Sequence, residues 1–363
     1  MKFFALIITL AALVAAACSG GGAAGDTAAK GSAEKETMQP IIGITHDQAT
    51  RQVDVTVDGE PFTSYCYWEK MYKPVIHPLR AADGRIYSRS FPVAMVVGER
   101  VDHPHHLSHW FNYGDINGID YWGTSDSVNL DSGHYGRIVH RSVDAISGGE
   151  GSGLLEVTMD WQTLEGKKQL TEHDKIYFRA EGDIRIIDRV ITLTAADEKI
   201  VFGDTKEGSF GIRLTRSLEE PTDQPLRFVD EHGDITEVAQ LNNEGVDGSY
   251  LSSEGMVDEK DVWGTAAKWC ILSGTVDGQP ATVGIFGHPD NPTYPTYWHA
   301  RGYGLFAANP FGWKTFTDGE KELNFALEPG QSATFRFRIV LGTDKLDATT
   351  TESMFNQWTA EKL

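Results

Sequence analysis

The chain has 363 residues, of which 40% are hydrophobic, 10% aromatic and 23% charged, and its formal net charge is −20. This balance is typical of a globular protein that can bury a sizeable core. The acidic residues are spread along the chain and no basic patch stands out. Nucleic acid is therefore excluded as an expected partner, because phosphate binding needs clustered cations.

The first residues predict an export signal with a lipid anchor. Met1-Lys2 precedes an apolar run from Phe3 to Val14, and Ala15-Ala16-Ala17 leads into Cys18. These features are typical of a signal peptide, and the cysteine makes the site resemble a bacterial lipobox. The alternative is an uncleaved anchor helix, but the run is too short to span a bilayer. We expect residues 1–17 to be a lipoprotein signal, and Cys18 to be acylated and to anchor the chain to a bilayer of the cell envelope. Residues 18–40 would be a disordered Gly/Ala/Ser tether.

From Ile41 onward the pattern predicts one domain, residues 41–363, built almost entirely of strands. A single helix is predicted near the end, where Thr349 and Glu352 can form a capping box and Met354, Phe355 and Trp358 share one face. The span 219–264 is polar and rich in Asp, Glu and Gly, which predicts a long excursion of the chain away from the strands. The fold class is all-β, a large antiparallel β-sandwich (supersandwich-like) with long loops and one C-terminal helix. The predicted strands are 61–68, 75–80, 91–97, 137–146, 153–162, 169–179, 183–193, 207–214, 268–275 and 333–339.

Two cysteines lie inside predicted strands, Cys66 and Cys270. They are compatible with a disulfide in an oxidising compartment or with two buried thiols, and the strand context favours thiols.

The most unusual stretch runs from Arg100 to Gly123 and holds four of the twelve histidines within seven residues. Its apolar positions follow neither the strand period nor the helix period, and Pro104 and three glycines predict a loop. A long loop rich in groups that bind protons, metals or sugars is more often functional than structural.

The spacing of the histidines leaves a metal site open. His103 and His105 would point to one side of an extended segment, and with His106 or His109 they could bind zinc, copper or iron. The alternative is that the rings hydrogen-bond loop carbonyls and hold the segment in place. The favoured expectation is no cofactor, with a divalent metal as the second possibility.

Two further groups could complete a site. Asp204, Lys206 and Glu207 lie between glycines and could form a pocket edge or an ordinary turn with a surface ion pair. Farther on, His299 and Arg301 alternate with Trp298 and Ala300, so one side of that strand is polar and could face the histidine loop. Imidazole and carboxylate groups together suit proton transfer, and aromatic faces suit sugar rings. No Gly-x-Ser-x-Gly elbow supports a serine triad.

Five motifs in order resemble a bacterial family of unknown function labelled methane oxygenase PmoA-like. The matching motifs are His-Pro-Leu-Arg at 77–80, Asp-His-Pro-His-His at 102–106, the segment 114–122, Asp-Thr-Lys-Glu-Gly at 204–208, and the segment 303–312. The chain departs from the family pattern at Leu107-Ser108-His109. The resemblance implies a galactose-mutarotase-type β-sandwich and a role in carbohydrate metabolism. The resemblance does not imply methane oxidation. A membrane oxygenase subunit needs several apolar spans of about twenty residues, and the only long apolar run in this sequence is Phe3 to Val14.

Together these features predict an envelope lipoprotein that acts on a sugar or oligosaccharide by His/Glu acid–base chemistry, as an epimerase, a dehydratase or hydratase, or a hydrolase. Two alternatives are a non-catalytic glycan-binding lipoprotein and a metal-dependent enzyme using His103, His105 and His106. Asp120 is the candidate second carboxylate for hydrolysis. The expected catalytic residues are His105, His106 and Glu207. The expected substrate-binding residues are His77, Arg80, Trp110, Asn117, Asp120, Trp122, Lys206, Trp298, His299, Arg301 and Asn309.

Overall fold

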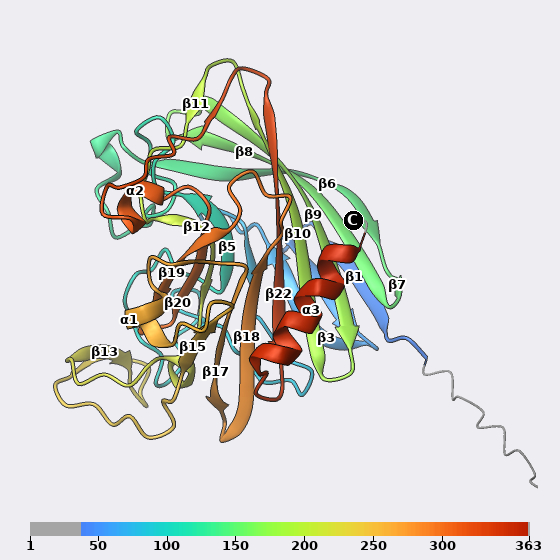
Figure 1. Cartoon of the computed structure of the whole chain (residues 1–363), viewed down its shortest axis with the longest axis vertical. Helices are drawn as coiled ribbons and strands as arrows, with labels where there is room; N and C mark the ends of the chain where they lie inside the picture. Colours follow the sequence, from blue (N-terminus) through green and yellow to red (C-terminus); the bar gives the residue numbers. More distant parts are fainter. Residues whose placement is uncertain (1–37, 362–363) are drawn as a thin grey trace, which may run out of the picture. The chain divides into compact units, whose positions relative to one another are not determined.

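The computed structural model describes residues 38–361 (Figure 1). The predicted signal peptide, Cys18 and most of the predicted tether lie outside the described residues. The chain from Gln39 on forms one compact unit. Within the described part, 22 strands and three short α-helices are present, and the strand pairing between them is antiparallel throughout. No helix in residues 38–361 is long and apolar enough to cross a membrane.

Two large sheets contain most of the strands. The ten-stranded sheet has the order β16 (Ala266–Ala267), β19 (Thr296–Arg301), β20 (Leu305–Asn309), β12 (Gly208–Arg213), β5 (His109–Tyr113), β4 (Val75–His77), β3 (Glu60–Cys66), β2 (Gln52–Val57), β1 (Ile41–Asp47) and β7 (Gly149–Glu150). The eight-stranded sheet has the order β15 (Ser249–Ser252), β17 (Trp269–Val276), β18 (Gln279–Gly287), β22 (Ser332–Gly342), β10 (Ile184–Ala195), β9 (Lys168–Glu181), β8 (Ser152–Thr163) and β6 (Gly136–Ser147).

The remaining elements are short. The two small sheets pair β11 (Ile200–Val201) with β21 (Ala326–Leu327) and β13 (Leu226–Val229) with β14 (Ile235–Val238). The α-helices are α1 (Asp258–Val262), α2 (Trp313–Phe316) and α3 (Ala348–Ala360), and 3₁₀ turns occupy Leu130–Ser132 and Arg216–Leu218. The predicted excursion at 219–264 therefore contains β13, β14, β15 and α1, and the β13–β14 pair projects at the lower left of Figure 1.

The main core lies between the two large sheets. Side chains alternate along β9, where Ile176, Phe178 and Ala180 are buried and the residues between them are partly exposed. They join one cluster with Val55 of β2 and Phe337 of β22, so both sheets contribute to a single core. This arrangement confirms the predicted all-β sandwich.

The helix α3 covers the outer face of the eight-stranded sheet (Figure 1). Phe355 and Trp358 pack there against Trp269 and Phe286, as their predicted shared face requires. The predicted capping box is wrong. The cap is Asp347, whose Oδ1 accepts the N–H of Thr350 at 2.7 Å.

Glu352, the other half of the predicted box, is engaged elsewhere. Its carboxylate accepts hydrogen bonds from Lys268 Nζ and Trp269 Nε1, both at 2.7 Å. It therefore ties the helix to the sheet instead of closing back on the helix end.

Two other local predictions are wrong. Residues 91–97 form turns instead of a strand, because the Glu99 carboxylate accepts the N–H groups of Ser90 and Phe91 and closes the segment into a loop. The predicted histidine loop contains the strand β5, which pairs with β4 and β12 in the middle of the sheet. Every residue of β5 is buried, so the alternation that identifies a half-exposed strand is absent.

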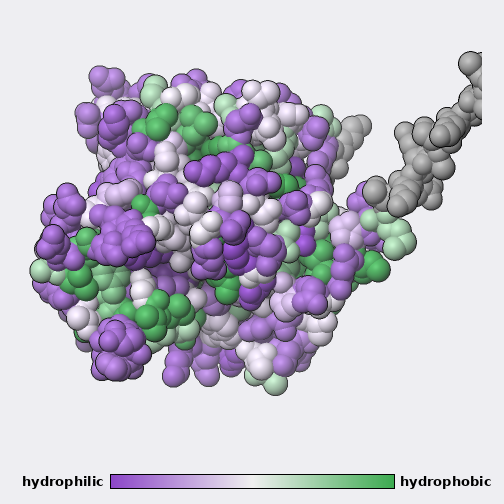
Figure 2. Space-filling view, turned by 90° about the horizontal axis from the view of Figure 1, so that it is seen from below, coloured by the Kyte–Doolittle hydropathy of each residue, from purple (hydrophilic) through white to green (hydrophobic). Residues whose placement is uncertain are grey.

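In the part of the chain that the structure describes, Cys66 and Cys270 are both buried and form no disulfide, which confirms the favoured thiol interpretation. Burial raises the pKa of both thiols, and buried thiols of this kind are chemically inert. At the surface, hydrophilic residues predominate on the face shown in Figure 2, and hydrophobic residues form separate patches.

A buried ionic cluster joins the two sheets behind β5. Arg189 of β10 donates to Asp174 Oδ2 through Nε at 2.8 Å and Nη2 at 2.5 Å, and Nη2 also reaches Glu172 at 3.4 Å. Its Nη1 contacts His109 Nε2 of β5 at 3.0 Å. Burial raises the pKa values of Glu172 and Asp174, and the charge of Arg189 opposes this rise. One guanidinium thus compensates two carboxylates that are almost fully buried.

Arg189→Leu should lower the free energy of unfolding by about 3–5 kcal/mol, because it leaves buried carboxylates without their cation. Urea denaturation at pH 7 measures the loss. The matched control is Lys199→Leu, which breaks the exposed Lys199–Glu328 pair and should cost less than about 1 kcal/mol. Equal losses in both variants would contradict this interpretation of the cluster.

Candidate functional site

A pocket of about 550 Å³ collects polar side chains from four separate segments of the chain. They come from the turn before β5, the turn after β5, the segment before β12, and β19 with the turn that follows it. The lining residues are His103, His105, His106, Asp120, Trp122, Gly123, Lys206, Glu207, His299, Arg301 and Tyr303. Nine of these were predicted from the sequence, and the fold brings them together.

The order of strands in the ten-stranded sheet explains this convergence. β19, β20, β12 and β5 are consecutive neighbours. Alternation along them separates two faces: Phe111 and Phe306 belong to the core between the sheets, whereas Trp110 and Ala307 belong to a second cluster on the other face. The pocket lies over that second face, which is the outer face of the sheet.

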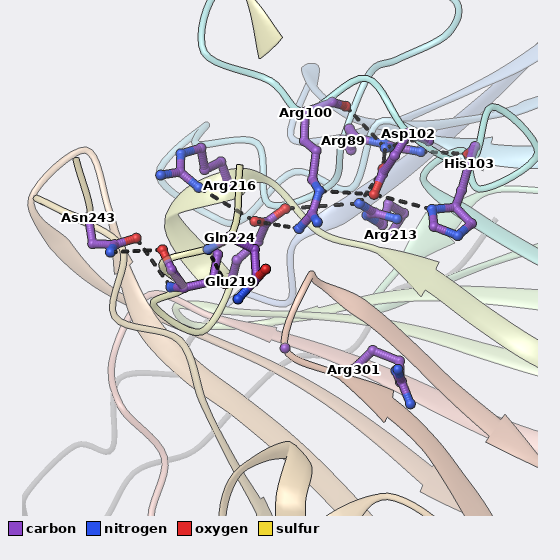
Figure 3. Close-up of polar contacts among 12 residues, drawn as sticks. Arg89, Arg100, Asp102, His103, Arg213, Arg216, Glu219, Gln224, Asn243 and Arg301 are labelled. Atoms are coloured by element: carbon purple, nitrogen blue, oxygen red, sulfur yellow. Dashed lines mark hydrogen bonds and ion pairs between the residues drawn. The ribbon is translucent and has the colours of Figure 1, made fainter. Parts of the chain in front are cut away.

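The Asp102 side chain holds the histidine segment, residues 103–106, in place (Figure 3). Its Oδ1 accepts hydrogen bonds from Arg89 Nη1 and Arg213 Nη2, each at 2.6 Å, and Arg100 Nε lies 2.9 Å from Oδ2. His103 Nδ1 lies 3.2 Å from the same Oδ2. Burial opposes ionisation, but the hydrogen bond from His103 and the three guanidinium charges hold the pKa of Asp102 well below its usual range.

Arg89 also fixes the backbone of this segment. Its Nη2 donates to the carbonyls of His103 at 2.9 Å and His106 at 2.7 Å, and the His106 N–H donates to the His103 carbonyl. The segment is therefore a turn, with His103 at φ 41°. The predicted extended geometry, with His103 and His105 on one side, is wrong for this reason.

Four aromatic rings form a column beside the pocket. Tyr303, His103, His106 and Trp110 follow one another with centroids 5.2, 5.0 and 5.1 Å apart, and successive planes differ by 3°, 4° and 10°. The column fixes the ring planes of His103 and His106. Trp110 was expected to stack on a sugar. It is fully buried at the inner end of the column and stacks on His106 instead.

Three of the imidazoles are held neutral. Burial, followed by the charge of Lys73, lowers the pKa of His105 far below its ordinary value, and burial lowers that of His106 as well. Burial, with Lys206 and Arg301, lowers the pKa of His299 to about 3. His106 Nε2 and His299 Nδ1 are buried and have no hydrogen-bond partner within residues 38–361. Both rings line the pocket, so each brings one nitrogen without a partner to the pocket wall.

Two carboxylates face the same pocket. Asp120 Oδ1 accepts the N–H groups of Trp122 at 2.7 Å and Gly123 at 2.9 Å. Burial, with the negative charge of Glu207, raises the pKa of Asp120. Glu207 forms an ion pair with Lys206, and its side chain is 33% exposed.

Gly114 permits the close approach of Glu207. The Gly114 N–H donates to the Glu207 carbonyl at 2.7 Å, and a Cβ at this position would lie 2.6 Å from Glu207 Cβ. Any larger residue would displace the carboxylate-bearing segment.

Sequence reasoning missed several residues of the site. Tyr303 lines the pocket, Arg89 and Arg213 hold Asp102, and Lys73, only 3% exposed, donates to the His105 carbonyl at 2.7 Å. Burial lowers the pKa of Lys73 to about 7. Tyr303 belongs to a motif recognised in the sequence, but nothing in the pattern singled out the arginines or Lys73.

Six predicted site residues do not line the pocket, and Trp110 is one of them. Trp298 points into the core between the sheets, because it alternates with His299. Asn309 donates to the Thr205 carbonyl at 3.0 Å and so supports the segment that carries Glu207. Asn117 bonds the backbone of Lys199.

The last two lie near the end of β4. His77 packs edge-on against Trp68, and Arg80 donates to the Gly84 carbonyl. Both are explained by local structure.

Within residues 38–361, no three His, Cys, Asp or Glu side chains are grouped so as to hold a metal ion. The three histidines of the metal hypothesis share the pocket, but their rings stack or meet edge-on.

The fold and the pocket define a large antiparallel β-sandwich with a polar pocket on the outer face of one sheet. The chain belongs to DUF6807, a family of unknown function, whose profile matches residues 52–356. The methane oxygenase label suggested by the motifs is not part of this match. A search of curated proteins finds no match.

Two solved structures are similar. One is the galactosidase domain of an alpha-galactosidase-sucrose kinase, AgaSK, with 10% identity, a TM-score of 0.42, and coverage of 84% of this chain and 42% of that chain. The chain thus spans less than half the length of that protein. The other is the Slr1438 protein from Synechocystis sp. PCC 6803, with 9% identity, a TM-score of 0.34, and coverage of 84% and 97%. At these scores neither likeness carries an argument, and the galactose-mutarotase comparison stays a prediction.

The imidazoles of His105 and His299 should stay neutral from about pH 8 to about pH 5, because their lowered pKa values lie far below the ordinary value of about 6.5. Nitrogen and carbon chemical shifts from histidine-labelled protein measure this, with His105→Gln and His299→Gln used for assignment. A titration midpoint near the ordinary value for either ring would contradict the burial argument.

Proposed function

We propose that the protein is an enzyme that acts on a sugar or oligosaccharide by proton transfer, with Asp120 and Glu207 as its acid–base pair. The observation that carries the proposal is the meeting of these two carboxylates, three neutral imidazoles and a guanidinium in one pocket. The pocket volume of about 550 Å³ also suits a small saccharide, since ligand pockets usually measure about 300–1,000 Å³.

The two carboxylates have different environments, as a pair with distinct acid and base roles requires. Burial raises the pKa of Asp120, so this group keeps its proton to higher pH and suits a general acid. The Glu207 side chain is 33% exposed and paired with Lys206, which suits the carboxylate that accepts a proton. His105 and His106, the acid–base groups predicted from the sequence, then serve as hydrogen-bonding residues, because their lowered pKa values make them weak bases.

The rest of the pocket wall supports a polyhydroxylated ligand. Within the described residues, His106 Nε2 and His299 Nδ1 have no hydrogen-bond partner, and Arg301, whose side chain is 36% exposed, presents further donors beside its ion pair with Glu259. Tyr303 borders the same pocket, is partly exposed and supplies aromatic surface for a sugar ring, whereas Trp122 lines the pocket but is only 2% exposed.

Asp120→Asn and Glu207→Gln should each lower kcat by about 10²–10⁴-fold, the usual contribution of a positioned acid or base. The assay is proton NMR in D₂O on a panel of neutral and uronic-acid oligosaccharides. New reducing ends report hydrolysis, new vinylic signals report elimination, and loss of a ring C–H signal reports epimerisation.

The matched control is Glu198→Gln, an exposed glutamate that pairs with Lys167 away from the pocket, and it should keep full activity. Conversion of no oligosaccharide in the panel, or unchanged kcat in Glu207→Gln, would overturn the proposal.

A further inference from the structure

A second concave site begins beside Trp68 and Lys73 and extends toward the β1 side of the ten-stranded sheet. Two cavities of about 640 and 410 Å³ share Arg51, Tyr67 and His140 in their linings, so they form one groove. It runs between the β1–β3 side of the ten-stranded sheet and β6, the last strand of the eight-stranded sheet. We call it the basic groove and define it by Arg51, Tyr67, Trp68, Arg137, His140 and Arg141.

The basic groove has ordered aromatic walls. Tyr67 stacks on His140 with centroids 3.9 Å apart and planes 24° from parallel. The Tyr67 hydroxyl is hydrogen-bonded to His46 Nε2 at 2.7 Å, and His140 Nδ1 to the Tyr65 hydroxyl at 3.1 Å. Trp68 lines the adjoining cavity. Aromatic rings fixed by their polar ends are suited to contact the apolar faces of sugar rings.

The groove brings arginines together in a chain whose net charge is −20. Its lining contains Arg51, Arg137 and Arg141 against Glu69 and Asp144. Arg141 is paired with Asp160 at 2.6 Å, and Lys73, the lysine of the lining, is buried and donates to the His105 carbonyl. Arg51 and Glu69 form only a loose exposed pair at 3.6 Å. Arg137 has no ion-pair partner within residues 38–361. The exposed guanidinium groups of Arg51 and Arg137 are therefore available to a carboxylate, which arginine binds through two parallel hydrogen bonds.

The edge of β6 argues against a peptide ligand. β6 is the terminal strand of its sheet, so its outer edge could in principle accept an added strand. Its register shifts between His140 and Ser142 and again between Val143 and Ala145. Such bulges twist an edge and prevent regular strand addition.

We propose that the basic groove is a second binding site, distinct from the Asp120–Glu207 pocket, for an acidic oligosaccharide that carries carboxylate groups. Tyr67 and Trp68 contact its rings, and Arg51 and Arg137 bind its carboxylates. The proposal does not depend on the chemistry proposed for the pocket.

The test is isothermal titration of the full chain with tetragalacturonate, at low and moderate salt. Wild-type protein should bind, and Arg51→Gln/Arg137→Gln should bind at least about tenfold more weakly, because two charge-assisted contacts are lost. The control Lys167→Gln/Lys199→Gln makes the same change in net charge at two exposed pairs elsewhere and should bind as the wild type does. Both double variants are also made in the Glu207→Gln background, which prevents turnover of the probe, and a loss confined to Arg51→Gln/Arg137→Gln separates this site from the pocket.

Four results would overturn the proposal. They are absence of binding by the wild type, equal weakening in the control double variant, equal affinity for neutral cellotetraose, and equal affinity for hexaglutamate, which would indicate a peptide site.

Discussion

The candidate site depends on one carboxylate, Asp102, held between three arginines. Arg89 and Arg213 are buried and donate to the same oxygen of Asp102, while Arg89 also binds two carbonyls of the turn that carries the histidines. A buried guanidinium needs such compensation, since an unpaired buried charge is very unfavourable. The arginines therefore fix Asp102, and Asp102 fixes the turn. The positions of His103 and His106 follow from an ionic cluster that is itself outside the pocket wall.

The order of the strands in the ten-stranded sheet brings the other pocket residues together. Because β19, β20, β12 and β5 are adjacent, segments separated by about two hundred residues in the chain reach one pocket. Behind β5, Arg189 connects His109 to two buried carboxylates of the other sheet. The same strand thus carries a structural histidine on its inner face and supports the histidine column on its outer face. This division explains why four histidines so close in sequence have different roles.

Patterns of alternation predicted the fold class and nine of the 22 strands in residues 38–361, because half-buried strands show a period of two. They failed at β5, which is buried on both faces, and at residues 91–97, where the Glu99 carboxylate closes a loop. Residue chemistry predicted nine of the pocket residues, including Glu207, His299 and Arg301. It could not identify Arg89, Arg213 or Lys73, since their roles arise from contacts between distant segments. Trp110 and Trp298 were predicted to contact a sugar, but both are fully buried. The sequence does not distinguish an aromatic residue in a core from one in a binding site.

The central claim is that the pocket of Asp120, Glu207, His299 and Arg301 binds a sugar. The most direct measurement is a crystal structure of the Glu207→Gln variant grown with a mixture of neutral and acidic oligosaccharides. The account predicts a saccharide in the pocket, with hydroxyls within hydrogen-bond distance of Asp120 and His299. A pocket that stays empty of sugar while saccharide binds only elsewhere, or a pocket occupied by a metal ion on His103, His105 and His106, would contradict it.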